Sequence, residues 1–228
     1  MKARLFIPAE KAALLCIDLQ EEHRQDERYL VEGFGDVLER VSRLQETARE
    51  RRVPVLHAAF VVDAEEVPAS RPLHPRGPDG KSAFSDRHDP RTEICAEVAP
   101  KGGEPVFFKS EASAFGNREL KAHLEELGIQ WLLIAGVWTE ACVDLTVRQA
   151  VDFGFRVLLV KDACGSGTLT MHQVAILNLA NRLYGGAVVD CQDACALLSG
   201  QGVDARQTPR PVPLRFRAET INELYEGV

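Results

Sequence analysis

Trp131-Leu-Leu-Ile-Ala-Gly-Val-Trp-Thr-Glu-Ala-Cys-Val143 is the stretch of sequence that decides the fold. Its apolar run reaches Gly136, and apolar residues recur at helical spacing after Cys142. A continuous apolar run is typical of a strand buried on both faces of a parallel sheet, and the later spacing predicts an amphipathic helix. We therefore expect a strand, a tight turn and the N-terminus of a helix within this one stretch.

Cys142 falls in the first turn of that expected helix. If Thr139 is the N-cap, the main-chain N–H of Cys142 has no partner within the helix, and the helix dipole favours a thiolate. A cysteine in this position is a candidate nucleophile. The alternative is a small buried core residue, which is a common role of free cysteine. The location at the C-terminal edge of a strand favours the nucleophile.

Strands and helices alternate along the whole chain. Apolar runs predict strands at residues 11–19, 53–62, 104–110, 131–136, 155–161 and 186–190, and helical patterns cover residues 33–52, 117–127, 169–184 and 192–198. Such alternation predicts an α/β fold with three layers, in which helices cover both faces of a doubly wound parallel sheet.

We expect one domain over residues 1–200, followed by a C-terminal arm, residues 201–228, that is not a separate domain. Residues 63–92 lose all periodicity and are rich in Pro, Gly, Arg and Asp. A loop longer than about 12–15 residues is usually a lid, a binding loop or a disordered segment.

The bulk composition narrows the classes of partner. The 228 residues carry a formal net charge of −7, whereas binding to nucleic acid or an anionic membrane calls for clustered Lys and Arg. No apolar run approaches the about 20 residues of a membrane span, and no secretory signal is evident. The six cysteines include no C-x-x-C pair. These features predict a cytoplasmic protein with free thiols that acts on a small molecule.

Three reactive residue types fall at the ends of expected strands: Asp18, Lys109 and Cys142. Ligands of open α/β sheets bind outside the carboxyl ends of the strands, so these side chains are expected to converge. Together they supply a base, a cation that holds it and a nucleophile. The alternative is a surface ion pair beside a buried thiol.

Four motifs appear in order: Leu15-Cys-Ile-Asp-Leu-Gln20, Val106-Phe-Phe-Lys-Ser-Glu-Ala-Ser-Ala-Phe115, Ala135-Gly-Val-Trp-Thr-Glu-Ala-Cys-Val143 and Val160-Lys-Asp-Ala-Cys164. They resemble the isochorismatase-like cysteine hydrolases, the superfamily of nicotinamidases and N-carbamoylsarcosine amidases, over about residues 10–198. The resemblance implies a six-stranded parallel sheet of order 3-2-1-4-5-6. It also implies catalytic roles for the three residues named above, a cis peptide bond between Val137 and Trp138, and an oxyanion hole formed by the N–H groups of Trp138 and Cys142.

The implied reaction is amide, ureido or carbamoyl cleavage through a thioester, with release of ammonia or an amine and with no cofactor. Nicotinamidase-like members carry an Asp and several His as metal ligands after the second strand. Here that region offers only the scattered His57, His74 and His88, so no metal site is expected. Glu21-Glu-His23 stands where an Asn-Asp or Asn-Asn often follows the first-strand motif, which leaves the pocket entrance unassigned.

Gln20, Phe60 and Trp138 are expected to contact the substrate. A homo-oligomer is also expected, because Leu214 and Phe216 in the Pro-rich tail would otherwise expose apolar surface. Two other functions remain open at this point: a thiol-based redox sensor that uses Cys142, and a catalytically idle member that acts as an oligomeric scaffold. The complete triad counts against the scaffold.

Overall fold

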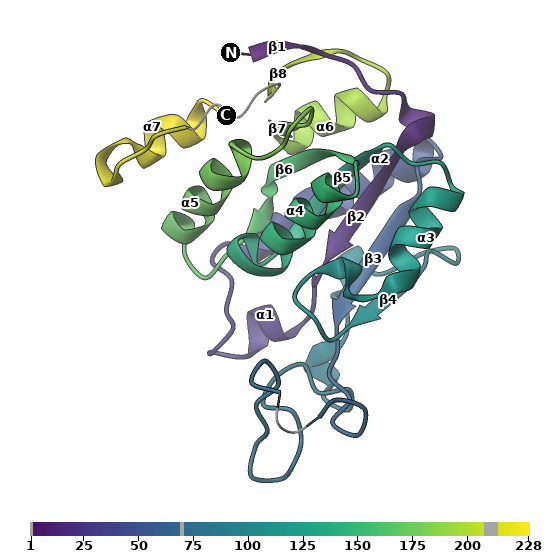
Figure 1. The fold of residues 1–228 in the computed structure, drawn as a ribbon, viewed down its shortest axis with the longest axis vertical. Coiled ribbons are helices and arrows are strands. Elements are labelled where there is room, and N and C mark those ends of the chain that lie inside the picture. Colours follow the sequence, from purple (N-terminus) through teal and green to yellow (C-terminus); the bar gives the residue numbers. More distant parts are fainter. Residues whose placement is uncertain (1, 69–70, 208–213) are drawn as a thin grey trace.

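A computed structural model describes residues 2–68, 71–207 and 214–228, in which a central sheet lies between two layers of helices (Figure 1). The strands are β1 (Lys2–Leu5), β2 (Ala12–Ile17), β3 (Val55–Phe60), β4 (Val106–Lys109), β5 (Trp131–Val137), β6 (Arg156–Gly165), β7 (Ala187–Val189) and β8 (Val203–Gln207). The helices are α1 (Glu22–Gln25), α2 (Phe34–Glu50), α3 (Arg118–Glu126), α4 (Asp144–Asp152), α5 (Leu169–Ala180), α6 (Cys191–Leu198) and α7 (Ile221–Glu226).

The sheet has eight strands in the order β1-β8-β7-β6-β5-β2-β3-β4. The run from β4 to β7 is parallel, whereas β8 pairs antiparallel with both β7 and β1. The predicted mainly parallel α/β sheet is therefore confirmed, but the predicted count of six strands was wrong. β1 is a short edge strand in which only Leu5 is buried, and β8, between β1 and β7, buries only Val203 and Ala205, so neither contains the continuous apolar run of a central strand.

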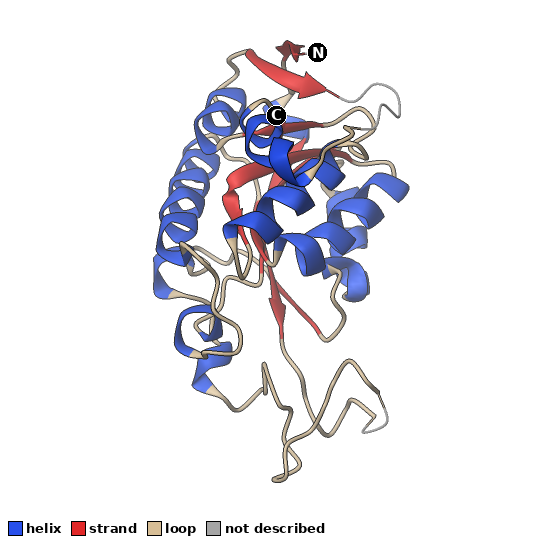
Figure 2. Ribbon diagram, turned by 90° about the vertical axis from the view of Figure 1, so that its left-hand side faces the viewer, coloured by secondary structure: helices blue, strands red, loops and turns tan. Residues whose placement is uncertain are grey.

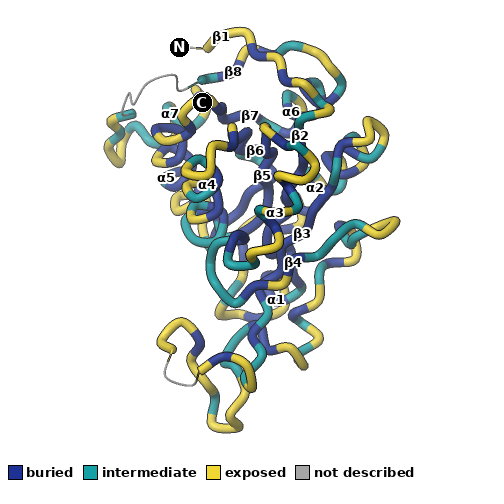
Figure 3. The backbone as a smooth tube through the Cα atoms, turned by 45° about the vertical axis from the view of Figure 1, so that its right-hand side comes forward, coloured by how far each residue is buried: buried dark blue, intermediate teal, exposed yellow. Residues whose placement is uncertain are grey.

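Helices cover both faces of the sheet, and α2 to α6 bury apolar side chains against it (Figure 2). One core cluster joins the sheet to α2 and α6, and a second joins its other face to α3, α4 and α5. All seven residues of β5 are buried, and the central strands form the dark interior of Figure 3. α7 packs against α5, outside the second layer.

Gly136 allows β2 and β5 to approach each other closely. The register pairs it with Ile17, and a Cβ atom at Gly136 would lie 2.1 Å from the carbonyl oxygen of Ile17. Its φ of +131° is also a conformation that other residues rarely adopt. The end of β5 is therefore held directly against the residue that precedes Asp18.

The long loop extends beyond the C-terminal ends of β3 and β4, at the bottom of Figure 1. It returns to the body through a bridge between Val62 and Asp86. Ser85 anchors the part of the loop that runs back toward the sheet, because its N–H and its hydroxyl both donate to the buried carboxylate of Glu22. This contact ties the loop to Glu22, the first residue of α1, which follows soon after β2 in the sequence.

The C-terminal arm packs on its own subunit. Leu214 and Phe216 are partly buried against the core on the α5 face, and Asn181 Nδ2 donates to the Leu214 carbonyl at 3.2 Å. The exposed apolar surface that motivated the homo-oligomer is thus covered within one chain, and the homo-oligomer stays a prediction. The Pro-rich segment at 209–213 lies outside the described residues. Within the described ranges, no helix combines the length and apolarity needed to cross a membrane.

Candidate active site

The structure brings Asp18, Lys109 and Cys142 together. Asp18 follows β2, Lys109 ends β4 and Cys142 lies in the turn after β5. Lys109 Nζ donates to Asp18 Oδ2 at 2.8 Å and lies 3.6 Å from Cys142 Sγ. It also donates to the Glu111 carbonyl at 3.2 Å. One ammonium group therefore links a carboxylate and a thiol at the carboxyl end of the sheet.

One carboxylate oxygen of Asp18 accepts a hydrogen bond, and the other has no hydrogen-bond partner among the described residues. The residue is 3% exposed, and its φ of +51° lies in the left-handed region, which Asp tolerates better than most residues. Lys109 holds Oδ2, whereas Oδ1 is buried without a hydrogen-bond partner among the described residues. A buried carboxylate oxygen without a donor can accept a proton from a neighbouring group.

The turn that carries Cys142 differs from the expected helix start. The peptide bond between Val137 and Trp138 is cis, as the resemblance implies. A π-helical turn, Thr139–Val143, then leads into α4. The predicted N-cap role of Thr139 was wrong, because its hydroxyl donates to the Gly165 carbonyl at 2.8 Å and caps no N–H of this helix.

The surroundings of Cys142 raise the pKa of its thiol and so favour the neutral form. Burial raises its pKa above the ordinary value, the adjacent Asp18 carboxylate raises the pKa further, and Lys109 lowers it without reversing the effect. The expectation of a thiolate stabilised by the helix dipole was therefore wrong. The sulfur becomes nucleophilic only when its proton moves to a base, and Asp18 is the base beside it.

Aromatic and aliphatic side chains surround the sulfur. Cys142 packs against a small cluster formed by Phe60, Val62, Val67 and Phe84. The ring centroid of Phe60 lies 4.6 Å from Lys109 Nζ and 5.7 Å from the ring of Phe84. Phe60, which was expected to contact substrate, therefore lies beside the reactive groups. Its ring also stabilises the ammonium through a cation–π contact.

Gln20 has a different role from the one predicted. Its side chain is fully buried, and Nε2 donates to the carbonyls of Phe60 at 2.9 Å and Thr92 at 2.7 Å. Its Oε1 accepts the Phe60 N–H at 2.9 Å. Because both amide protons are used by main-chain groups, the substrate-contact assignment is corrected. Gln20 therefore joins Phe60, at the end of β3, to Thr92, at the end of the long loop.

Trp138 is fixed by a histidine that the sequence analysis left unassigned. The indole Nε1–H donates to His23 Nδ1 at 3.2 Å, and the imidazole packs edge-on against Trp138 and Phe34. Burial lowers the pKa of His23 and raises that of Glu22. A polar run directly after a strand is typical of a solvent-exposed turn. The burial of Glu22 and His23 is therefore seen only in the structure, where the long loop contacts α1.

The histidines considered as metal ligands do not converge. His57 Nε2 lies 3.2 Å from Glu104 Oε2, His74 Nε2 contacts the Ser110 carbonyl at 2.5 Å, and the His88 N–H donates to Asp86. The rings of His57 and His74 therefore have their own local partners, whereas the bond of His88 is made by its main-chain N–H.

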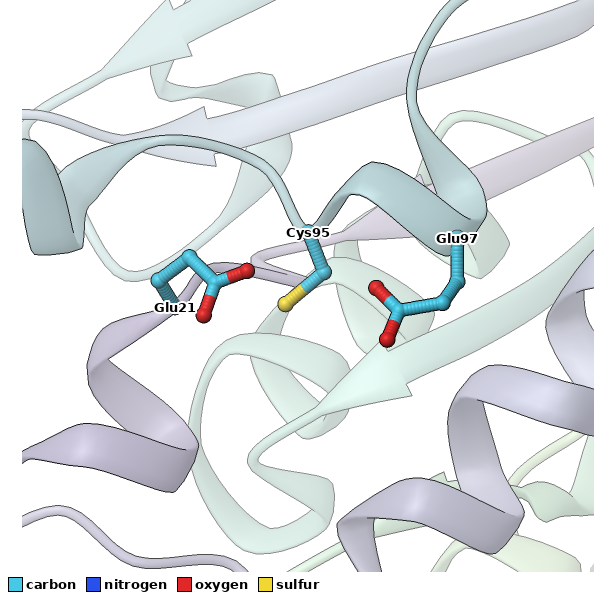
Figure 4. Close-up of side chains that lie close together, drawn as sticks. All are labelled: Glu21, Cys95 and Glu97. Atoms are coloured by element: carbon cyan, nitrogen blue, oxygen red, sulfur yellow. The ribbon is translucent and has the colours of Figure 1, made fainter.

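One group of metal-ligand type does occur among the described residues, formed by Glu21, Cys95 and Glu97 (Figure 4). Arg24 already occupies it, because Nε donates to Glu21 at 2.7 Å and Nη1 donates to Glu97 at 2.7 Å. Burial raises the pKa of the Cys95 thiol to about 12. The group is an ion-pair network around a protonated thiol.

Two cavities flank the reactive residues without including them. One of about 480 Å³ lies at the β3–β4 edge and is lined by Val106, Phe108 and the returning loop. Another of about 400 Å³ lies between α1 and the loop, with Glu22 and Ser85 in its wall. Within the triad, the side chains of Lys109 and Asp18 are 0% and 3% exposed, whereas Cys142 is only partly buried.

Known proteins share the sequence pattern and the fold of this chain. The isochorismatase domain model matches residues 12–193. A ureidoacrylate amidohydrolase from Methylobacterium radiotolerans is 26% identical over 212 residues, covering 85% of this chain and 80% of that protein. Nicotinamidase 3 of Arabidopsis thaliana is 28% identical over 183 residues, covering 79% of this chain and 85% of that protein.

The fold is also shared with a solved structure, a cysteine hydrolase from Pseudomonas syringae pv. phaseolicola. Its TM-score is 0.77 at 20% identity, with 87% of this chain and 97% of that chain covered. The resemblance seen in the motifs is confirmed, and the chain belongs to the isochorismatase family.

Proposed function

We propose that the chain is a cysteine-dependent amidohydrolase that cleaves a small amide, ureido or carbamoyl compound and releases ammonia or an amine. The observation that carries this proposal is the Lys109 ammonium, which contacts both Asp18 Oδ2 and Cys142 Sγ while Asp18 Oδ1 stays unpartnered. Relatives named as amidohydrolases support an enzyme acting on carbon–nitrogen bonds other than peptide bonds.

In the acylation half, Asp18 accepts the thiol proton and Cys142 Sγ attacks the carbonyl carbon. A sulfur–carbon bond forms, and the carbonyl electrons move to oxygen. The main-chain N–H groups of Trp138 and Cys142 are assigned to that oxyanion. The carbon–nitrogen bond then breaks, and the leaving nitrogen takes the proton back from Asp18, which leaves a thioester.

In the deacylation half, Asp18 removes a proton from water as the water oxygen attacks the thioester. The sulfur–carbon bond breaks, the acid product leaves, and the proton on Asp18 returns to the Cys142 thiolate. Lys109 holds the carboxylate in place through both halves and offsets the negative charge shared by Asp18 and the sulfur. Each step uses residues at the carboxyl ends of β2, β4 and β5.

A redox sensor based on Cys142 is less well supported. Sensor cysteines react as exposed thiolates of low pKa, whereas burial and Asp18 raise the pKa of this thiol. A sensor would also need a resolving thiol, and Cys164 is buried in β6, where burial raises its pKa to about 12. A scaffold without catalysis does not explain a buried ion pair placed against a thiol.

Ammonia release from a panel of amides, ureido acids and carbamoyl amines tests the proposal. We expect turnover of at least one member by the wild-type chain and none by Cys142→Ala. No release from any compound, with the protein shown to be folded by circular dichroism, would refute an amidohydrolase.

We further propose that residues 201–228 belong to the same unit as residues 1–200, because β8 pairs with β7 and α7 packs on α5. The protein is expected to be a cytoplasmic homo-oligomer. Light scattering at micromolar concentration tests its oligomeric state. A monomeric mass there would refute the oligomer.

A further inference from the structure

Thr139 directly follows Trp138 and is hydrogen-bonded to Gly165, at the end of β6, and to His172 in α5. It is completely buried, and its Oγ1 lies 2.8 Å from the Gly165 carbonyl and 2.8 Å from His172 Nδ1. A carbonyl oxygen can only accept, so the single hydroxyl proton of Thr139 goes to Gly165. His172 Nδ1 must then carry a proton and donate it to Thr139.

The other imidazole nitrogen is therefore an acceptor. His172 Nε2 lies 3.1 Å from the hydroxyl of Tyr225, which must donate to it. Burial lowers the pKa of His172 to about 4 and raises that of Tyr225 to about 12, so both groups stay neutral near pH 7. The hydrogen bonds run in one direction, from Tyr225 through His172 and Thr139 to Gly165.

Tyr225 is held firmly although it lies on the short last helix. Lys161 Nζ donates to the Tyr225 carbonyl at 3.0 Å and lies 4.9 Å from its ring centroid. The ring also packs edge-on against His172, with centroids 5.6 Å apart. This helix lies beyond the residues that match the family domain, which end at 193. The C-terminal arm is therefore linked to the turn that carries Cys142 through His172, from outside that domain.

We propose that Tyr225 and His172 are positioning residues that fix Thr139 and, through it, the main-chain N–H of Trp138 assigned to the oxyanion. The proposal rests on the cysteine amidohydrolase function given above. Thr139 is bonded covalently to Trp138, so a displaced Thr139 shifts Trp138 and with it the Val137–Trp138 peptide group that carries this N–H. Donors to an oxyanion stabilise the transition state only when they are already aimed at it.

Tyr225→Phe tests the role because it removes the hydroxyl and keeps the ring. We expect kcat to fall on the order of 10-fold with KM unchanged, as for a loss confined to the transition state. Tyr184→Phe is the matched control, since its hydroxyl is near the surface and lies 3.4 Å from Arg182. A kcat for Tyr225→Phe within twofold of the Tyr184→Phe value would contradict the proposal.

Thr139 variants separate positioning from general stability. Thr139→Ser keeps the hydroxyl and should retain most of the wild-type kcat, whereas Thr139→Val should behave like Tyr225→Phe or worse. Melting temperatures of all variants are measured alongside. If Thr139→Ser loses as much kcat as Thr139→Val, the hydroxyl is not what positions the turn and the proposal is wrong.

The tautomer of His172 provides a measurement that needs no substrate. In ¹⁵N NMR of the wild-type chain, His172 should carry its proton on Nδ1, and Tyr225→Phe should shift it toward the Nε2–H form. An Nε2–H tautomer in the wild type would overturn the hydrogen-bond direction. An inactive wild type would refute the amidohydrolase, whereas an active wild type with unaffected Tyr225→Phe would refute only the positioning role.

Discussion

Two of the clusters among the described residues combine a cysteine, a carboxylate and a cation but differ in how these groups are buried and paired. Cys142 lies beside Asp18 and Lys109, whereas Cys95 lies beside two glutamates that share Arg24. In the first cluster the side chains of Lys109 and Asp18 are 0% and 3% exposed. In the second, Arg24 and its partner Glu97 are 37% and 48% exposed.

The difference lies in burial and in unused hydrogen-bonding capacity. Arg24 spreads its donors over both glutamates, and Cys95 has no base within the network that lacks a partner. Asp18 keeps a buried oxygen without a donor, next to a thiol. Residue type alone therefore does not distinguish a nucleophile from a structural thiol, and matched substitutions in the two clusters should have opposite consequences.

The largest contrast is expected between the two cysteines. Cys142→Ala should reduce ammonia release at least ~100-fold, a loss of more than ~2.7 kcal/mol in transition-state stabilisation. Cys95→Ala should leave kcat unchanged and cost about 1 kcal/mol of unfolding free energy, as is typical of a small core change. Steady-state ammonia assays and urea unfolding measure both. Residual Cys142→Ala activity above a hundredth of wild type would mean that sulfur is not the nucleophile.

The cations should differ next. Lys109→Met leaves the Asp18 carboxylate buried without its counter-charge, so it should slow turnover and cost about 3–5 kcal/mol of unfolding free energy. Adding Asp18→Asn to that variant should restore stability but not activity. Arg24→Met removes an exposed pair and should cost less than ~1 kcal/mol. Equal losses in urea unfolding for Lys109→Met and Arg24→Met would erase the distinction between the clusters.

A smaller effect is expected on the alkylation rate of Cys142, which should increase in a variant that has lost activity. The carboxylate of Asp18 raises the pKa of Cys142, so Asp18→Asn should lower that pKa and increase the thiolate fraction at pH 8. Iodoacetamide should then label Cys142 several-fold faster in a variant that no longer turns over substrate. Labelling is followed by peptide mass spectrometry, with Glu21→Gln as the control.

In the wild type, the labelling rate of Cys142 should keep rising above pH 9, because the pKa is raised. A midpoint at or below the ordinary thiol value of about 8.5 would show that the thiol is ionised at rest. Slower labelling of Asp18→Asn than of wild type would show that the carboxylate activates the free thiol rather than suppressing it.

The smallest expected effect is that of salt. At about 1 M salt the Debye length is only ~3 Å, so the exposed Arg24 pairs should lose their contribution. The stability difference between wild type and Arg24→Met should therefore disappear, while that between wild type and Lys109→Met should persist. Parallel urea titrations at low and high salt check this. A salt-sensitive Lys109 pair would indicate that water reaches it.

The sequence predicted the features that local patterns carry. Buried strands are recognisable as apolar runs, and the positions of their ends predict that Asp18, Lys109 and Cys142 lie at one edge of the sheet. Asn117 was expected to begin a helix, and its side chain does accept the Glu119 N–H of α3. These successes depend on short-range pattern and on the general geometry of parallel sheets.

The rest depended on contacts between distant segments. Burial of Glu22 requires Ser85, which arrives only when the long loop returns. The hydrogen bond of Thr139 to His172 likewise displaced its expected capping role. The pKa of Cys142 was misjudged because a helix N-terminus can be read from the sequence, whereas depth of burial and the distance to a carboxylate cannot.

Gly136 has a consequence for how this gene can vary. Any single-base change in the first or second position of a glycine codon replaces it with a residue that has a Cβ atom, or with a stop. That atom would lie 2.1 Å from the Ile17 carbonyl oxygen, one residue before Asp18. Every such amino-acid change at this codon should therefore push the base away from the nucleophile. Lineages that keep the activity should show only synonymous variation there.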